Sequence, residues 1–339
     1  MSRPVKYLSL SYEQQDFNEF FRNFIDTSKV ENFFKSTEGQ IEEEASLISE
    51  LSVQYIDSIK ENSNPSFFSI PLNRAEYIDG QARKNKKAIK FNDNFTISQK
   101  KFELTDIIMH SGKGLENGHY YTISKRKIKL NNGREHTVFL QHKDEATKCF
   151  IKFGNEVQCR NIKDVENLVD PYEFATLADI KGSEKIEQNF VNIVYQTYIP
   201  SSKINEAYQG LKNYGNSCYI NSFLAVVAGM NDGREKTSLL AELEKNGIKF
   251  SDNKFSSTDE NKNMQDLVNA LRINRNEVQL ALYKAVHLNT RETLPETTIQ
   301  TSHPLNISEN PPETTIHPKC HSSVYDFYKN FNLFSCCGG

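Results

Sequence analysis

The chain has 339 residues, a formal net charge of -3 and a pI of about 6.3. This charge excludes the strongly basic surface on which nucleic-acid binding depends, so we expect no nucleic-acid partner. The sequence contains no run of 18 apolar residues, so we expect no membrane-spanning helix. The six cysteines are too scattered for a disulfide framework. We therefore expect a monomer with reduced thiols in the cytoplasm of its own cell, or in a host cytosol if it is a secreted effector.

The first predicted element is an amphipathic helix over Tyr12 to Asp26. Its apolar residues recur at helical spacing, at Phe17, Phe20, Phe21, Phe24 and Ile25. From residue 66 to about 198 the pattern changes to short β-rich runs separated by turn residues. The predicted strands are Phe67 to Ile70, Ala88 to Phe91, Leu104 to Met109, His119 to Ile123, Thr137 to Leu140 and Phe190 to Ile199. Asn131-Asn132-Gly133 predicts a hairpin turn.

A polar connection over residues 200–209 leads back to helical sequence. The predicted helices are Cys218 to Gly229, Ser238 to Asn246 and Asn263 to Ala285. Residues 289–319 are dominated by Thr, Pro, Ser and Glu, so we expect them to be disordered. In the tail that follows, the pair Cys336 and Cys337 resembles the doubly prenylated ends of some small GTPases. The simpler interpretation is that both are reactive surface cysteines without a role.

The strongest chemical signal is the segment 210–224, which reads GLKNYGNSCYINSFL. Gly215-Asn216 predicts a turn that leads directly into a helix whose first residue is Cys218. A helix N-terminus presents unsatisfied N–H groups and a positive dipole, which lower the pKa of a thiol. The same N–H groups, with the side-chain amide of Asn213, are suited to holding an oxyanion. Taken alone, Cys218 has the alternative interpretation of a buried structural cysteine.

A cysteine nucleophile needs a base, and the sequence contains eight histidines. His119 lies in Gly118-His119-Tyr120-Tyr121, downstream of the strand predicted at Leu104 to Met109. A strand, a glycine-bearing loop and a second strand are predicted, which places the imidazole at the start of the second strand. The alternative for this histidine alone is a solvated hairpin residue.

Both segments resemble motifs of the ubiquitin-specific proteases. The cysteine box of that family, G-L-x-N-x-G-N-x-C-Y-x-N-S-x-L, matches Gly210, Leu211, Asn213, Gly215, Asn216, Cys218, Tyr219, Asn221, Ser222 and Leu224. Its histidine box, L-x-x-x-x-x-H-S-G followed by a loop and G-H-Y, matches Leu104 through Tyr120. The resemblance implies that Cys218 is the nucleophile and His119 the general base, while His110 is a non-catalytic histidine.

The resemblance also implies a third catalytic residue, but here the match is incomplete. The family has a strand that ends in Phe and is followed by Asn or Asp, whereas this chain reads Phe153-Gly154-Asn155. Gly154 cannot orient an imidazole, so either Asn155 does so or the site works as a Cys-His dyad. The sequence leaves both alternatives open.

The family also has a Q-D helix, which resembles Gln15-Asp16 and the residues after it, and whose acidic residue contacts the tail of ubiquitin. The resemblance therefore implies an α+β, papain-like cysteine protease with fingers, palm and thumb. In this chain the Q-D helix and histidine box precede the cysteine box, which implies a circular permutation. The implied parts are a thumb helix (1–26), short fingers (27–65), a palm with the histidine box (66–199), a linker joining the old termini (200–209), a thumb with the cysteine box (210–288), the disordered stretch (289–319) and the tail (320–339).

The implied activity is hydrolysis of the isopeptide or peptide bond after the Gly-Gly end of ubiquitin or polyubiquitin. A narrow cleft at Gly118 and Tyr120 is expected to select glycine, and no metal or cofactor is expected, since the fingers segment contains no cysteine. Two alternatives remain: a protease or transferase for a ubiquitin-like modifier, and a pseudo-enzyme that binds ubiquitin without cutting it. Linkage preference, source organism and the role of the tail are not determined by the sequence.

Overall fold

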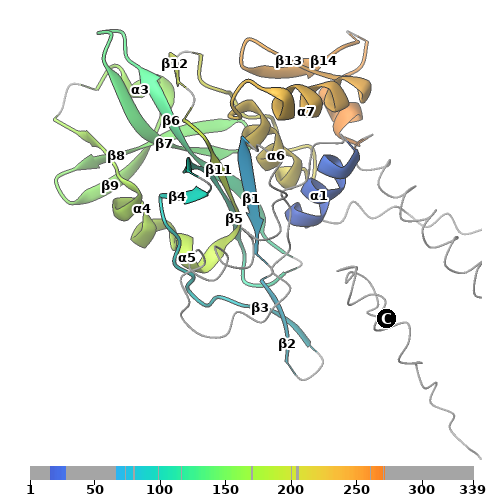
Figure 1. The fold of residues 1–339 in the computed structure, drawn as a ribbon, viewed down its shortest axis with the longest axis horizontal. Coiled ribbons are helices and arrows are strands. Elements are labelled where there is room, and N and C mark those ends of the chain that lie inside the picture. Colours follow the sequence, from blue (N-terminus) through green and yellow to red (C-terminus); the bar gives the residue numbers. More distant parts are fainter. Residues whose placement is uncertain are drawn as a thin grey trace, which may run out of the picture. The chain divides into compact units, whose positions relative to one another are not determined.

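The computed structural model describes residues 16–27, 66–72, 74–78, 81–97, 99–115, 117–168, 171–199, 201–203, 206–259, 261–269 and 271. Within these residues a ten-stranded, mainly antiparallel sheet carries helices on both faces, so the fold mixes helices and sheet as the α+β prediction requires (Figure 1). The fingers segment before residue 66, residues 289–319 and the tail lie outside the described residues, so the predictions made for them stay predictions.

The large sheet has the order β1-β11-β5-β6-β7-β8-β10, with β4 on β5, β9 on β8 and β12 parallel to β6. Its strands are β1 (Phe67–Pro71), β4 (Asn94–Ile97), β5 (Lys100–Ser111), β6 (His119–Lys129), β7 (Glu135–Lys143), β8 (Ala146–Phe153), β9 (Glu156–Asn161), β10 (Glu173–Phe174), β11 (Phe190–Gln196) and β12 (Ser201–Lys203). Two separate hairpins are formed by β2 (Ala75–Ile78) with β3 (Gln81–Lys84) and by β13 (Ile248–Ser251) with β14 (Lys254–Ser257).

The helices divide between the two faces of the sheet. They are α1 (Phe17–Thr27), α3 (Ile162–Val165), α4 (Leu177–Glu184), α5 (Ile186–Asn189), α6 (Cys218–Ala228) and α7 (Arg234–Lys245). One apolar cluster joins α1, α6 and α7 to the sheet, and a second joins α4 and α5 to the sheet. Strand β11 is buried along its whole length because its side chains enter both clusters: Val191 and Val194 the first, Phe190 and Ile193 the second.

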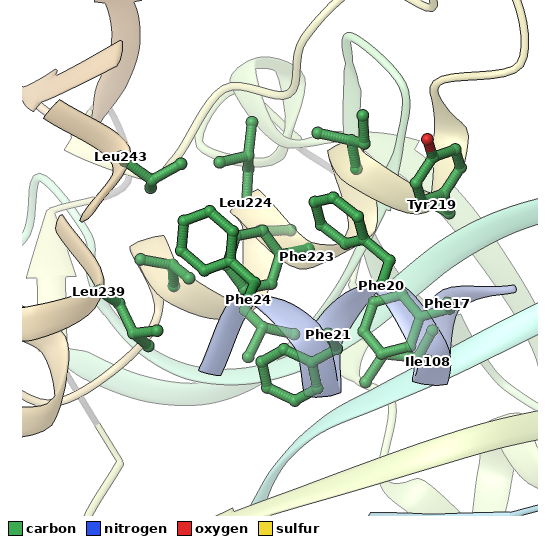
Figure 2. Packing of buried hydrophobic residues seen from close by; sticks show 14 of the residues in the cluster. Phe17, Phe20, Phe21, Phe24, Ile108, Tyr219, Phe223, Leu224, Leu239 and Leu243 are labelled. Carbon is green, nitrogen blue, oxygen red and sulfur yellow. The ribbon is translucent and has the colours of Figure 1, made fainter. Parts of the chain in front are cut away.

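Helices α1 and α6 lie side by side although about 200 residues separate them in the sequence (Figure 2). The Phe223 ring of α6 packs against Phe20, Phe21 and Phe24 of α1, with ring centroids 4.8 to 5.5 Å apart. Each fully buried Phe side chain contributes roughly 1.5–3 kcal/mol by leaving water. The amphipathic stripe predicted from the sequence is thus the face of α1 that holds the helix against α6.

Most predicted elements are present, with boundaries that differ by a few residues. The strand predicted at Ala88 to Phe91 is wrong: this segment pairs with no strand, and the Ile89 N–H donates instead to the Glu187 carbonyl at 2.9 Å. Ile89 and Phe91 are buried in the second apolar cluster, so their alternation reflects burial rather than strand pairing. Helix α7 begins at Arg234, four residues before the predicted start.

Three successive hairpins determine where the ends of the central strands lie. The predicted turn at Asn131-Asn132-Gly133 joins β6 to β7, and Gly133 has the positive φ (+81°) that such a turn needs. Two-residue turns then join β7 to β8 and β8 to β9. Because each strand reverses direction, the start of β6 and the turn between β7 and β8 lie at the same end of the sheet. None of the helices in the described part of the chain is long and apolar enough to cross a membrane.

Candidate active site

His119 is the first residue of β6, at the end of a central strand of the sheet, as the strand–loop–strand prediction places it. Its backbone is paired to Ser111, whose hydroxyl donates to the His119 carbonyl at 3.2 Å. The residue before it must be glycine, since a Cβ on Gly118 would lie 2.2 Å from Nε2 of His110 and 2.6 Å from the Ser111 carbonyl oxygen. The sheet therefore fixes the backbone of His119, while its side chain remains about one quarter exposed.

Cys218 is the first residue of α6, as predicted. Gly215 and Asn216 both have positive φ (61° and 54°) and form the turn that leads into the helix. The Cys218 residue is only 2% exposed, and it lies in the same buried cluster as Tyr120, whose backbone N–H acts to lower the pKa of the thiol. Since Tyr120 directly follows His119, the structure brings the thiol to the strand end that carries the imidazole.

The electrostatic balance at Cys218 differs from the sequence prediction. The backbone N–H groups do lower the pKa of the thiol, as expected at a helix N-terminus, but burial raises it by more, and Asp144 raises it further. Burial likewise lowers the pKa of His119, which the Asp144 carboxylate only partly offsets. Burial thus opposes the ionisation of both groups, and it outweighs the lowering of the thiol pKa that the sequence predicts from the helix N-terminus.

The carboxylate that faces His119 belongs to Asp144, a residue that the sequence analysis did not select. Nε2 of His119 lies 3.3 Å from Oδ2 of Asp144, and both side chains are about three-quarters buried. The distance is that of an ion pair, but within the described residues Nε2 has no hydrogen bond of good geometry, so the contact is electrostatic rather than a linear hydrogen bond. With Nε2 directed at the carboxylate, Nδ1 is the ring nitrogen available to a thiol.

Asn155, the predicted third catalytic residue, lies at the opposite end of the strands. It is an exposed residue of the turn between β8 and β9. Strand β8 begins beside the His119 end of the sheet and runs away from it over eight residues, or about 23 Å at the usual rise per residue. A side chain cannot bridge that length, so Asn155 does not lie beside His119 in this structure, and the carboxylate that lies there is that of Asp144.

The sequence does contain a signal for Asp144. The turn at Asn131 to Gly133 sets the β6–β7 register, in which Thr122 pairs with His142 without a bulge. Continuing that register by two residues brings Asp144 opposite Tyr120, next to His119. The count reaches Asp144 only because β7 extends to Lys143, beyond the strand predicted at Thr137 to Leu140, and that extension is seen only in the structure.

The loop before Cys218 is closed by its own side chains and packs on the turn that carries Asp144. Ser217 donates from its backbone N–H (3.1 Å) and hydroxyl (3.2 Å) to Oδ1 of Asn213. This directs the oxygen of the Asn213 amide at Ser217, and the NH₂ group is the end that can donate to an oxyanion. Gly210 passes so close to the turn that a Cβ there would lie 1.6 Å from the Asp144 carbonyl oxygen.

The residues predicted to bind substrate lie partly within this site. The Tyr120 hydroxyl donates to Oδ2 of Asp16 at 3.5 Å, and Asp16 also accepts from the Glu19 N–H at 3.0 Å, at the start of α1. Burial, followed by the nearby Asp16, raises the pKa of Tyr120. Gln15 lies outside the described residues. Neither the contact of Asp16 with a ubiquitin tail nor the glycine selectivity at Gly118 and Tyr120 is tested by this geometry.

Two other histidines near the site are unsuited to act as the base. His110 is buried against the Tyr120 ring (4.6 Å between centroids), and burial lowers its pKa to about 4. His142 is also buried, which lowers its pKa to about 3. Among the residues that the structure describes, no group of three or more His, Cys, Asp or Glu side chains could hold a metal ion. Of these three histidines, His119 is the one at the start of β6, next to Tyr120, which shares a buried cluster with Cys218.

Comparison with known proteins adds one finding. A family model described as ubiquitin carboxyl-terminal hydrolase matches residues 4–149, somewhat less than half of the chain. This range contains α1, His119 and Asp144 but ends before Cys218. No curated protein matches the chain.

Proposed function

Residues 4–149 carry the match to the ubiquitin carboxyl-terminal hydrolases, a family of cysteine-dependent hydrolases, and from this premise we propose that the chain is a deubiquitinase. In this proposal it hydrolyses the isopeptide or peptide bond after the terminal Gly-Gly of ubiquitin, with Cys218 as nucleophile, His119 as general base and Asp144 as the acidic third residue. The observation that carries it is the packing of α6 on β6, which places Cys218 and Tyr120, the residue after His119, in one buried cluster across about 100 residues of sequence.

The reaction begins with transfer of the Cys218 proton to Nδ1 of His119. The thiolate attacks the carbonyl carbon of the terminal glycine, and the oxyanion accepts hydrogen bonds from the Cys218 N–H and the Asn213 amide. The C–N bond then breaks, the imidazolium gives its proton to the leaving amine, and a thioester to Cys218 remains. His119 next removes a proton from water, which attacks the thioester and releases the glycine carboxylate and the thiol.

Asp144 supports the charged form of His119 that exists between these steps. Its carboxylate attracts the imidazolium, and its position at Nε2 leaves Nδ1 directed at the thiol. Burial disfavours the charged forms of both groups, so the imidazolium of His119 needs the support of the Asp144 carboxylate once the proton has moved. Asp144 therefore acts in the transition state, where the imidazolium develops, which is where an interaction accelerates a reaction.

The proposal includes the circular permutation of the family's catalytic domain. The family match ends at residue 149, whereas the cysteine box begins at Gly210. Helix α1 nevertheless packs against α6 (Figure 2), and α6 packs on β6, so the parts meet in space whatever their order in the chain. The connection that joins the old termini is short, and its strand β12 runs parallel to β6.

The test is hydrolysis of a fluorogenic C-terminal ubiquitin amide, with matched probes that carry the tails of ubiquitin-like modifiers. Cys218→Ala and His119→Ala are expected to abolish turnover without loss of folding, because each removes a reacting group. A ubiquitin vinyl-type electrophile should form an adduct with the wild-type protein and none with Cys218→Ala. Preference for a modifier tail would indicate the ubiquitin-like alternative, and tight ubiquitin binding without adduct or turnover would indicate a pseudo-enzyme.

A further inference from the structure

Asn221 connects the nucleophile helix to the acidic residue of the site. It follows Cys218 by three residues on α6, so both side chains project from the same face of the helix. The Asn221 side-chain Nδ2 lies 3.2 Å from Oδ1 of Asp144, and it also lies 2.9 Å from the Leu211 carbonyl and 3.4 Å from the Lys212 carbonyl. One amide therefore contacts both the turn that carries Asp144 and the loop that precedes the nucleophile.

The orientation of the Asn221 amide is determined by these acceptors. The three atoms around Nδ2 are all oxygens, so exchanging the amide nitrogen and oxygen would direct Oδ1 at three other acceptors. In the observed orientation Oδ1 is buried and has no hydrogen-bond partner within the described residues. The contacts of Asn221 in the described residues are thus all made by its Nδ2 donor.

The two oxygens of Asp144 have different partners. Oδ1 accepts from Asn221, and Oδ2 faces Nε2 of His119. Asp144 lies in the left-handed region (φ 51°) of the two-residue turn between β7 and β8. With Oδ1 held by Asn221, rotation of the carboxylate away from His119 would break the hydrogen bond.

We propose that Asn221 is a positioning residue, which holds the Asp144 carboxylate toward His119 and thereby joins nucleophile, acid and base in one unit. This inference rests on the proposed function for its effect on turnover. It assigns to Asn221 an action through Asp144 and not on the substrate. Removing Asn221 should consequently lower turnover much more while Asp144 is present than after Asp144 has been removed, when only the contacts with the Leu211 and Lys212 carbonyls are left to lose.

The experiment is a double-mutant cycle of Asn221→Ala and Asp144→Ala, measured on the fluorogenic ubiquitin amide. We expect Asn221→Ala to lower kcat about 10- to 100-fold, as loss of a group that orients catalytic residues does, with KM changed less than about threefold. In the Asp144→Ala background the same substitution should change kcat less than about twofold. An equal loss in both backgrounds, or a loss confined to KM, would overturn the inference.

Folding and proposed function are controlled separately. Asn221→Leu keeps the branched shape of the side chain but removes its hydrogen-bond donor, and it is expected to lose kcat as Asn221→Ala does. Asn231→Ala is the matched control: Asn231 is also buried, but its amide donates to the Tyr198 carbonyl, outside the site, and turnover should be unchanged. NMR titration of the His119 imidazole needs no substrate. The pKa should fall in Asp144→Ala, fall likewise in Asn221→Ala and fall no further in the double variant.

These readouts separate two failures. If the wild-type protein hydrolyses no ubiquitin or modifier substrate but the titrations are non-additive, the proposed function fails and the inference about Asn221 stands. If hydrolysis is observed but the His119 titration is unaffected by Asn221→Ala, the inference fails and the proposed function stands.

Discussion

Two turns at opposite ends of β8 are alike in length and backbone shape but differ completely in what surrounds them. Asp144 and Gly154 are each the first residue of a two-residue hairpin, with φ of 51° and 57°. The Asp144 turn lies against His119, Asn221 and Gly210, whereas Gly154 and Asn155 are exposed. The chain thus offers two similar polar turns, and only the end of the sheet at which a turn lies decides which of them can take part in catalysis.

The largest expected effect is on turnover. Asp144→Ala should lower kcat for ubiquitin-amide hydrolysis by at least about 100-fold, because removing the orienting acid of a catalytic triad can cost as much as about 10⁴-fold. Asn155→Ala should leave kcat within about twofold of wild type. Steady-state kinetics of the two variants show which turn supplies the third catalytic residue. A large loss of kcat in Asn155→Ala with none in Asp144→Ala would restore the sequence-based assignment. No effect of either would indicate a dyad.

A smaller effect is expected in the pH profile. The Asp144 carboxylate stabilises the imidazolium and so raises the pKa of His119, although burial lowers it by more. In Asp144→Asn the raising contribution is lost, so the pKa falls and the acid limb of kcat/KM should move to lower pH. Asn155→Asp places a new carboxylate at the other turn and should leave the limb in place. A limb that moves with Asn155→Asp and not with Asp144→Asn would contradict the geometry.

The smallest expected effect is on stability. Exchanging the two turn residues, by Asp144→Gly together with Gly154→Asp, gives each left-handed position a residue that tolerates it. The free energy of unfolding should change by less than about 1 kcal/mol, since the gain and loss of a glycine nearly cancel. Turnover should nevertheless fall as far as in Asp144→Ala. Denaturant unfolding measures the free energy of unfolding of this variant, and steady-state kinetics measures its turnover. Retained activity would show that turnover does not require a carboxylate at position 144.

The sequence by itself determined the chemical groups and their local settings. The order of Gly215, Asn216 and Cys218 predicts a turn into a helix, and Gly118-His119 after a strand predicts a fixed imidazole, because these are short-range consequences of backbone geometry. The phenylalanine spacing likewise predicts the buried face of α1. The prediction of a strand at Ala88 to Phe91 is wrong, because apolar residues that alternate to pack on a neighbouring cluster give the same sequence pattern as a paired strand.

Only the tertiary structure decided which residues meet and how they ionise. The partner of His119 depends on the register and direction of three successive strands, so a motif ending at Asn155 points to the wrong end of β8. The pKa of Cys218 depends on the packing of α6 against β6, where burial outweighs the helix N–H groups. Both properties arise from contacts between segments far apart in sequence. Local patterns carry information about the backbone nearby, and the long-range contacts are set by how the whole sheet and its helices pack.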